Sequence, residues 1–567
     1  MGIPTDIEIA SAASLRPPVE IAGRLGIPEE FVEPYGRSVA KIDLACLTAP
    51  GQPTQQRAKY VVISAVTPTP LGEGKTTTAV GLADGLARIG RNVAVTLRQP
   101  SMGPTFGIKG GAAGGGYSQV VPMDKLNLHL TGDFHAITAA HNLLAAIVDN
   151  HLHHGNQLQI DPHNITWRRV LDVNDRALRN LVVGLGSKVD GVPRQSGFDI
   201  TAASEVMVLL SLATSLEDLR ERLRRIVIGY SYAGRPITAD DLGAAGAMAV
   251  ILQDALNPNL LQTLEGTPAL IHCGPFGNIA TGNSSIVADL VATRRADIVL
   301  TEAGFGADMG CERFMNVKCR VSGLRPDAAV LVVTIRALKT HSGRFDVKAG
   351  KPLPPEMLEE NPDDVRAGLP NLIKHIEIVN TFGVSPVVAI NAFPSDHASE
   401  HQVVIDAAER LGIDVAVTRH VAEGGAGAEA LAEALLKALD RPTNFRFTYE
   451  LDAPLVDKID AVARKVYGAE GIDVLPAAAS ALAAYEKLGF GALPVVIAKT
   501  HLSVSSDPKL LGAPTGWRLP VREVRAAAGA GYVYAICGEM RTMPGLSSHP
   551  NAERIDLTPD GAIIGLS

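Results

Sequence analysis

The sequence has little cysteine, no long apolar run and no excess of positive charge. Its five cysteines are scattered over 567 residues and form no CxxC pair, which fits a reducing compartment and argues against a structural zinc site. The net charge of −8 argues against nucleic acid or an anionic membrane as the main partner. No apolar run approaches the roughly 18 residues that a membrane-spanning helix needs.

The start of the chain lacks the basic segment and apolar core of a signal peptide. Charged residues make up 20% of the chain and apolar residues 46%, which is typical of a globular protein with large cores. We therefore expect a cytoplasmic enzyme with small-molecule substrates, no nucleic-acid partner and no membrane partner.

Apolar runs of strand length alternate with helical patterns through most of the chain, as in a parallel α/β architecture. The runs are almost continuously apolar, which is typical of strands covered by helices on both faces. The clearest expected strands are residues 60–65, 92–97, 296–301, 328–335, 385–390 and 493–497.

A glycine-rich turn, Thr69-Pro-Leu-Gly-Glu-Gly-Lys-Thr-Thr-Thr78, directly follows the first of these strands. The glycines let backbone N–H groups point at an anion, Lys75 can reach the β- and γ-phosphates of a nucleotide, and the Thr76 hydroxyl can ligate Mg²⁺. The usual phosphate loop has glycine where this chain has Thr69. The alternative to a phosphate loop is an ordinary strand–turn–helix that binds no nucleotide. An amphipathic run over residues 79–89 favours a nucleotide-binding loop.

These patterns predict an α/β fold with a large P-loop-containing parallel-sheet domain, a second α/β domain and a smaller C-terminal domain. We place the first domain at residues 1–370, the second at 371–502 and the third at 503–567. A polar, proline-rich segment at residues 348–364 is expected to be a surface loop after the first large unit. The C-terminal domain could also include segments inserted in the first part of the chain that pair with it.

A second glycine-rich stretch, Gly107-Ile-Lys-Gly-Gly-Ala-Ala-Gly-Gly-Gly-Tyr117, has six glycines in eleven positions and cannot form a stable helix or strand interior. Lys109 favours a loop shaped around an anion over a flexible surface loop. With the phosphate loop and Val333-Thr-Ile-Arg-Ala-Leu-Lys-Thr-His-Ser-Gly343, this string resembles the signatures of the formate–tetrahydrofolate ligase family. Similar blocks, such as Thr301-Glu-Ala-Gly-Phe-Gly-Ala-Asp308 and Asn127-Leu-His-Leu-Thr-Gly-Asp133, extend the resemblance nearly end to end.

The resemblance implies a reaction in two stages. ATP phosphorylates formate to formyl phosphate, and N10 of tetrahydrofolate then attacks the carbonyl carbon, so that phosphate leaves in place of oxide. The protein's task is to hold two anions together and to stabilise the phosphoryl group during transfer. The family also implies stimulation by a monovalent cation (K⁺ or NH₄⁺) and a homotetramer.

Site residues follow from the loop and from the resemblance. The expected catalytic residues are Lys75, Arg98 and Asp133, where Arg98 matches the family arginine at formyl phosphate and Asp133 matches a family acid. The alternative for Asp133 is a cap of a helix over residues 135–147. The expected metal ligand is Thr76. The expected ligand-binding residues are Thr69, Gly72, Glu73, Gly74, Lys75, Thr76, Thr77, Lys109, Phe305, Phe393, Pro394 and Val421.

Several positions that the family assigns to ligand binding depart from its pattern, mainly around the expected ring-binding pocket and, at Leu71, in the nucleotide loop. The family has tryptophan where this chain has Val421, and the other departures are Leu71, Gln99, Ser342, His501 and Leu502. One interpretation is drift within an ordinary formate–tetrahydrofolate ligase. The alternative is a relative that makes the same acyl phosphate but formylates a different amine. A P-loop ATPase switch is a third candidate, disfavoured by the second glycine-rich stretch and by Arg98.

Overall fold

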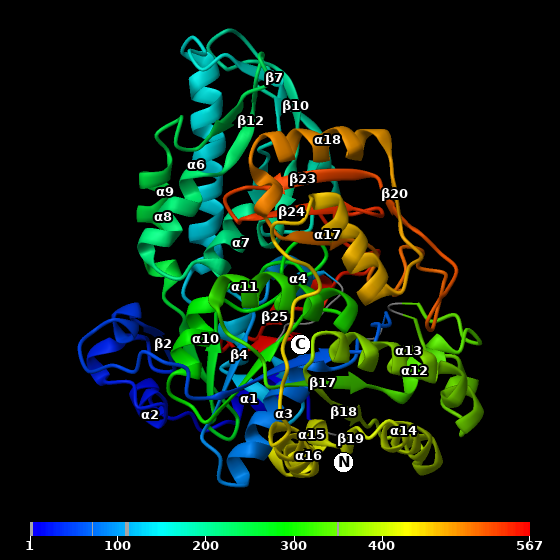
Figure 1. Cartoon of the computed structure of the whole chain (residues 1–567). Helices are drawn as coiled ribbons and strands as arrows, with labels where there is room; N and C mark the ends of the chain where they lie inside the picture. Colours follow the sequence, from blue (N-terminus) through cyan, green and yellow to red (C-terminus); the bar gives the residue numbers. More distant parts are fainter. Residues whose placement is uncertain (1–3, 71, 108–112, 349–350, 567) are drawn as a thin grey trace.

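The computed structural model describes residues 4–70, 72–107, 113–348 and 351–566. A large, mostly parallel sheet runs through the lower half of the molecule as drawn in Figure 1. In spatial order, its strands are β1 (Val32–Tyr35), β2 (Val39–Ile42), β14 (Asn259–Thr263), β15 (Pro268–Ile271), β4 (Val93–Leu97), β16 (Ile298–Glu302), β3 (Lys59–Ala65), β17 (Ala328–Val333), β18 (Ser385–Asn391) and β19 (Asp414–Thr418). The strands from β15 to β19 pair in parallel, whereas β1, β2 and β14 pair antiparallel. The predicted parallel α/β architecture is confirmed at this level.

Both faces of the parallel strands are buried, which explains why they read as continuous apolar runs. Along β17, Ala329, Leu331 and Val333 pack into one core, and the alternate residues pack into another. Helices α3 (Lys75–Arg88) and α16 (Glu429–Leu439) cover one face of the sheet. Helices α10 (Ile286–Thr293), α13 (Pro362–Thr381) and α14 (Ala398–Arg410) cover the other face.

A second unit lies above the sheet in Figure 1. It contains α6 (Asp133–His153), α7 (Glu205–Leu212), α8 (Leu216–Arg224) and α9 (Ala245–Leu252), with a core of its own. The C-terminal elements α17 (Leu455–Val462), α18 (Pro476–Lys487), β21 (Val495–Ala498), β23 (Glu523–Ala527) and β24 (Tyr532–Ile536) pack beside it. Gly529 N–H donates to Glu205 at 2.7 Å, and Arg222 donates to the carbonyl of Ala530 at 3.0 Å.

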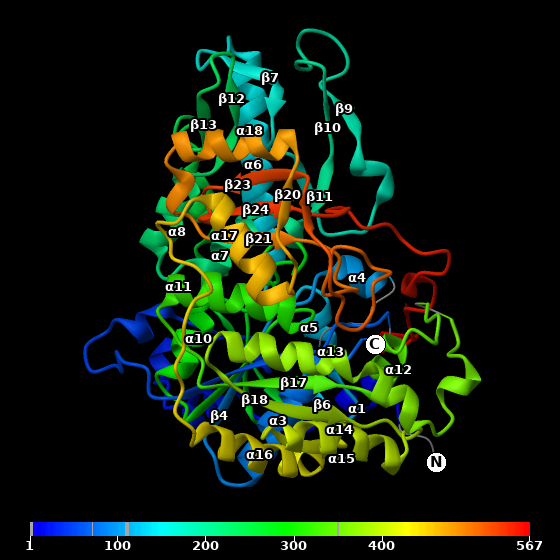
Figure 2. The ribbon, with the colours of Figure 1, turned by 45° about the vertical axis from the view of Figure 1, so that its right-hand side comes forward.

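The remaining elements are short and lie mainly at the edges. A hairpin of β9 (Leu181–Val183) and β10 (Arg194–Ser196) projects from the molecule in Figure 2. The other strands are β5 (Gly114–Gly115), β6 (Ser118–Val121), β7 (Ile160–Ile165), β8 (Arg169–Leu171), β11 (Phe198–Ile200), β12 (Val227–Ser231), β13 (Pro236–Thr238), β20 (Ile472–Val474), β22 (Leu519–Val521), β25 (Asp556–Leu557) and β26 (Ile563–Ile564). The other helices are α1 (Asp6–Ser11), α2 (Pro18–Arg24), α4 (Met102–Phe106), α5 (Met123–Asn127), α11 (Cys319–Ser322), α12 (Ile335–His341) and α15 (His420–Glu423).

All six expected strands form, and five of them belong to the main sheet. The sixth, β21, pairs with β24 in a separate sheet. The main sheet continues past residue 370 because β18 pairs with β17, while the division into three domains stays a prediction. Helix α13 begins at Pro362, inside the segment expected as a loop, because the Asn361 side chain caps it by accepting from Asp363 and Asp364 N–H.

All five cysteines of the chain are buried and form no disulfide, and burial raises the pKa of Cys46 to about 11. Among the described residues, no helix is long and apolar enough to cross a membrane.

Glu312 is a fully buried carboxyl between two π-helical turns, Ala307–Cys311 and Phe314–Lys318. Its Oε1 accepts from Asn316 Nδ2 at 2.7 Å, whereas its Oε2 has no hydrogen-bond partner within the described ranges. Burial raises the pKa of Glu312 from 4.5 to about 7. A raised carboxyl pKa stabilises the fold at low pH, and that stabilisation is lost as the pH rises through 7.

We expect Glu312→Gln, which cannot ionise, to remove this dependence. The stability of the variant relative to wild type should increase by up to about 3 kcal/mol between pH 5 and pH 8. Thermal unfolding of both proteins across this range is the measurement, with the exposed Glu433→Gln as the matched control. A difference between Glu312→Gln and wild type that stays constant with pH would contradict the assignment.

Candidate active site

Most of the expected site residues lie at one edge of the sheet, where the carboxyl ends of its parallel strands meet. The phosphate loop follows β3, Arg98 follows β4, Glu302 ends β16, Thr334 follows β17, and Phe393 lies just beyond β18. Ligands of open parallel sheets bind at this edge. Leu71 and Lys109 lie outside the described residues.

Thr67 lies two residues before the phosphate loop, and buried side chains of α12 and α13 hold it in place. Asn371 accepts from Thr67 N–H at 3.1 Å, and His375 Nε2 lies 2.9 Å from the Thr67 hydroxyl. His341 Nε2 lies 2.9 Å from the Thr67 carbonyl oxygen. Burial lowers the pKa of His375 to about 4, so this imidazole is neutral at physiological pH.

Glu73 shapes the loop from within. Its side chain is buried, and Oε1 accepts from the backbone N–H of Thr69 at 2.8 Å and from the Thr69 hydroxyl at 3.0 Å. Its Oε2 accepts from the Thr334 hydroxyl at 2.7 Å, and Asn391 Nδ2 donates to the Glu73 carbonyl at 3.1 Å. The sequence predicts Glu73 among the ligand-binding residues, and in the structure its carboxylate faces the protein.

Helix α3 begins directly after the loop, with Gly74 as its N-cap and Lys75, Thr76 and Thr77 in its first turn. The first N–H groups of a helix have no partner inside the helix, and together with the helix dipole they favour an anion at this end. The structure therefore places the predicted phosphate-binding residues where an anion site is expected.

Glu302 connects this first turn to Arg98. The Thr76 hydroxyl donates to Glu302 Oε2 at 2.5 Å, and Arg98 Nη2 lies 3.3 Å from Glu302 Oε1. Carboxylate and hydroxyl oxygens are suitable ligands for Mg²⁺, and substrate phosphates and water usually complete its coordination shell. Thr76 and Glu302 therefore fit a magnesium ion. Within the described ranges, no group of three or more His, Cys, Asp or Glu side chains could hold a metal.

Asp133 lies in a separate polar cluster and is not a helix cap. It is the first residue of α6, whose N-cap is Gly132, so the capping alternative is wrong. Lys41 Nζ pairs with Asp133 Oδ1 at 2.8 Å, and Asn259 Nδ2 donates to Oδ2 at 2.7 Å. All three side chains are buried, which fixes the carboxylate in a charge-compensated position.

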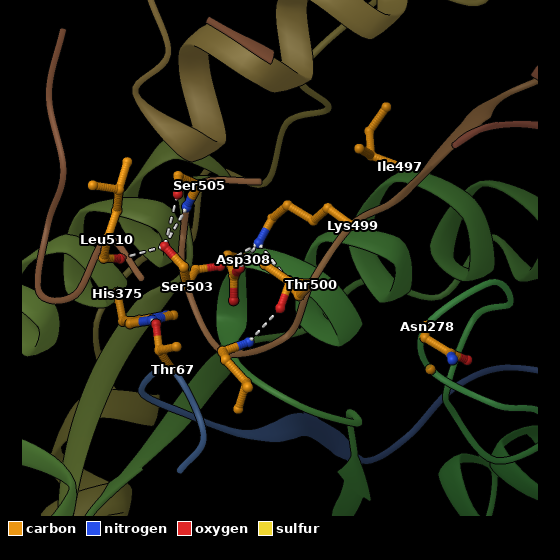
Figure 3. A network of polar contacts seen from close by, with 12 residues as sticks. Thr67, Asn278, Asp308, His375, Ile497, Lys499, Thr500, Ser503, Ser505 and Leu510 are labelled. Atoms are coloured by element: carbon orange, nitrogen blue, oxygen red, sulfur yellow. Dashed lines mark hydrogen bonds and ion pairs between the residues drawn. The ribbon is translucent and has the colours of Figure 1, made fainter. Parts of the chain in front are cut away.

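Phe305 has a left-handed backbone with φ of +60°, which is rare for a residue with a bulky side chain. Its ring stacks on His501, with the ring centroids 4.7 Å apart. The loop that carries His501 is fixed at Lys499, whose Nζ pairs with Asp308 Oδ2 at 2.6 Å and donates to the Ser503 carbonyl at 2.6 Å (Figure 3). The stacked pair of Phe305 and His501 thus joins two distant segments of the chain.

The other expected ring-binding residues have different neighbours. The Arg336 guanidinium lies 3.9 Å from the centroid of the Phe393 ring, in a cation–π contact. Val421 lies beside the second glycine-rich stretch, and its carbonyl accepts from Tyr117 N–H at 2.8 Å. A side chain at Gly116 would collide with that carbonyl, which explains the glycine there.

Sequence reasoning missed Glu302, Lys41 and Arg336 as contributors to this edge. Glu302 and Arg336 lie inside the family-like blocks quoted above, and a charged residue that ends an apolar strand is the signal that could have identified Glu302. Lys41 carries no such signal, because its partner Asp133 is distant in the sequence.

Comparisons with known proteins identify the family. A family model described as formate–tetrahydrofolate ligase matches residues 4–567. This chain belongs to the formate–tetrahydrofolate ligase family. It is similar to the formate–tetrahydrofolate ligases of Cutibacterium acnes, with 67% identity over 99% of this chain and all of the relative, and of Saccharopolyspora erythraea, with 65% identity over the full length of both. Formate–tetrahydrofolate ligase 3 of Rubrobacter xylanophilus is 62% identical over 99% of this chain and all of that relative.

Membership in the formate–tetrahydrofolate ligase family confirms the resemblance inferred from the motifs. The identity extends over the whole chain, and the comparisons give no support to a departure from the family in the ring-binding pocket. The hypotheses of a different amine acceptor and of an ATPase switch gain no support from them either.

The two loop glycines make a sharp test of the loop geometry. Gly72 and Gly74 both have left-handed φ, +79° and +73°. A methyl group at Gly74 would collide with Asn391 Nδ2, whereas one at Gly72 meets no described atom within 4 Å. Gly72→Ala should therefore cost only backbone strain, about 1–2 kcal/mol, and Gly74→Ala a further 1–3 kcal/mol or so from crowding.

The measurement is thermal or urea unfolding of both variants and of Gly74→Ala combined with Asn391→Ala. We expect the combined variant to be more stable than the sum of its single changes predicts, because removing the amide makes room for the methyl group. Equal destabilisation by Gly72→Ala and Gly74→Ala would show that Asn391 does not crowd the loop.

Proposed function

We propose that this chain is an ATP-dependent formate–tetrahydrofolate ligase that formylates N10 of tetrahydrofolate. The observation that carries the proposal is the shared contact of Thr76 and Arg98 with Glu302 in a member of this family. It supports a nucleotide at the loop and a second anion at the neighbouring Arg98. Formate, ATP and tetrahydrofolate are the small-molecule substrates, and a homotetramer that is stimulated by a monovalent cation is the expected form.

In the first step, a formate oxygen attacks the γ-phosphorus of ATP, the bond to the bridging oxygen breaks, and ADP leaves. Lys75 and the N–H groups of the first turn of α3 bind the phosphates, and Arg98 neutralises charge on the transferred phosphoryl group. Thr76 and Glu302 are the residues that would hold Mg²⁺, whose chemistry is to neutralise the charge of the phosphates.

In the second step, N10 of tetrahydrofolate attacks the carbonyl carbon of formyl phosphate. The carbon–oxygen bond breaks, phosphate leaves and the amine loses a proton. Phe305, Phe393, Pro394 and Val421 are the proposed ring-binding residues. Asp133, held by Lys41, is the proposed acid near the reacting groups.

The deciding assay measures ADP released from ATP with formate, in the presence and absence of tetrahydrofolate, and identifies the product by mass. Formate-dependent ADP release with formation of formyltetrahydrofolate is the expected result. ADP release that does not depend on formate, or a folate product without a formyl group, would overturn the proposal.

Lys75→Ala should reduce ADP release roughly a hundredfold or more, because it removes the mobile cation at the β- and γ-phosphates. The exposed Lys437→Ala on α16 is the matched control and should retain wild-type turnover. Circular dichroism and thermal unfolding check that the variant folds. Near wild-type turnover in Lys75→Ala would remove the nucleotide-loop assignment.

Arg98→Ala should lower kcat much more than it weakens ATP binding, because the interaction of Arg98 strengthens as charge develops on the phosphoryl group. Steady-state kinetics together with calorimetric ATP binding separate the two effects. An unchanged kcat with a large loss of ATP affinity would assign this arginine to the nucleotide instead.

A further inference from the structure

Glu302 is a buried carboxylate whose two oxygens contact different parts of the candidate active site. Only 5% of the residue is exposed. Its Oε2 accepts from the Thr76 hydroxyl in the first turn of α3, and its Oε1 forms an ion pair with Arg98. One side chain therefore contacts both the nucleotide loop and the guanidinium expected to bind the second anion.

Arg98 has few competing contacts. Its Nη1 donates to the Pro275 carbonyl at a long 3.4 Å, and its Nε is buried without a hydrogen-bond partner among the described residues. About a quarter of its side chain is exposed. The guanidinium therefore has donors left for an anion, while Glu302 neutralises part of its charge.

Because Glu302 also contacts Thr76, a divalent cation bound at Thr76 would change how strongly Glu302 interacts with Arg98. A hydroxyl oxygen that ligates Mg²⁺ still donates its hydrogen, so Thr76 can bind the ion and keep Glu302 as its acceptor. A dication beside the buried Glu302 carboxylate attracts it strongly, because the low local dielectric weakens screening. The carboxylate then holds Arg98 less tightly.

We infer that Glu302 couples the metal–nucleotide site to the anion site at Arg98. Without the metal, Glu302 holds Arg98 and competes with formate for the guanidinium. With metal and nucleotide bound, Glu302 turns its charge toward the metal, and Arg98 becomes available to formate and then to the transferred phosphoryl group. Glu302 is thus a positioning residue that favours formate binding after the nucleotide, and this inference rests on the proposed function.

Coupling between two sites is reciprocal, so it can be measured from either ligand. If Mg²⁺ and ADP raise the affinity for formate, formate must raise the affinity for ADP by the same factor when Mg²⁺ is present. Typical couplings of this kind are roughly 5- to 150-fold. ADP is the suitable probe, because it occupies the loop without allowing the reaction to proceed.

The experiment is calorimetric titration of ADP into the full-length protein with and without Mg²⁺, each with and without saturating formate. In the wild type, we expect formate to tighten ADP binding about fivefold or more with Mg²⁺ present and less than twofold in EDTA. A formate effect of equal size in the two conditions overturns the inference, and this measurement needs no variant.

Glu302→Gln removes the charge and keeps the shape of the side chain. We expect this variant to lose the Mg²⁺ dependence of the formate effect and to bind ADP in EDTA at least as tightly as the wild type. A purely structural role for Glu302 would instead weaken ADP binding in every condition. Glu312→Gln, a buried carboxyl that contacts Asn316, is the matched control and should keep the wild-type coupling.

The two proposals fail in different ways. Loss of formate-dependent ADP release in the wild type would remove the proposed function. If the wild-type protein releases ADP with formate, the ligase assignment stands. If formate then changes its ADP affinity equally with and without Mg²⁺, the role of Glu302 is overturned. Wild-type coupling in a folded Glu302→Gln variant would overturn that role as well.

Discussion

The parallel pairing of β4, β16, β3, β17 and β18 is the constraint on which the site depends. It places the carboxyl ends of these strands side by side, so that short turns from distant parts of the sequence meet at one edge. Because both faces of the sheet are covered by helices, this edge is where the strands can present polar groups to a ligand. The loop after β3 lies between the strands that carry Glu302 and Thr334, and side chains from both contact it.

Buried charges hold the edge in one geometry. The pairs Lys41–Asp133 and Lys499–Asp308 are almost wholly inside the protein, and each also uses neighbouring carbonyl or amide groups. Such pairs contribute little net stability, since removing charge from water offsets their attraction. Their satisfied geometry instead fixes where a loop lies, as Lys499 does for the segment that stacks His501 on Phe305.

The sequence predicted the local parts of this structure better than their connections. Continuous apolar runs indicated the strands because both faces are buried, and the glycine turn before Lys75 indicated the phosphate loop. Neither pattern contains information about partners such as Thr76 and Glu302, which are 226 residues apart. The motif blocks identified the family without any information about contacts, since a long sequence string is specific even where its contacts are unknown.

The way the loop is held has a consequence for its chemistry. Inside the turn, Glu73 accepts a hydrogen bond from the backbone of Thr69. Asn391 and Thr334 hydrogen-bond to Glu73 from one side, and Glu302 contacts the first turn of α3 from the other. Donors that are already oriented need no reorganisation when charge develops in a transition state, which is where preorganised sites gain most. Among these contacts, only that of Glu302 joins the loop to a second anion-binding side chain. Electrostatic coupling between the two substrates would therefore pass through this carboxylate, while the contacts on the other side keep the loop in position.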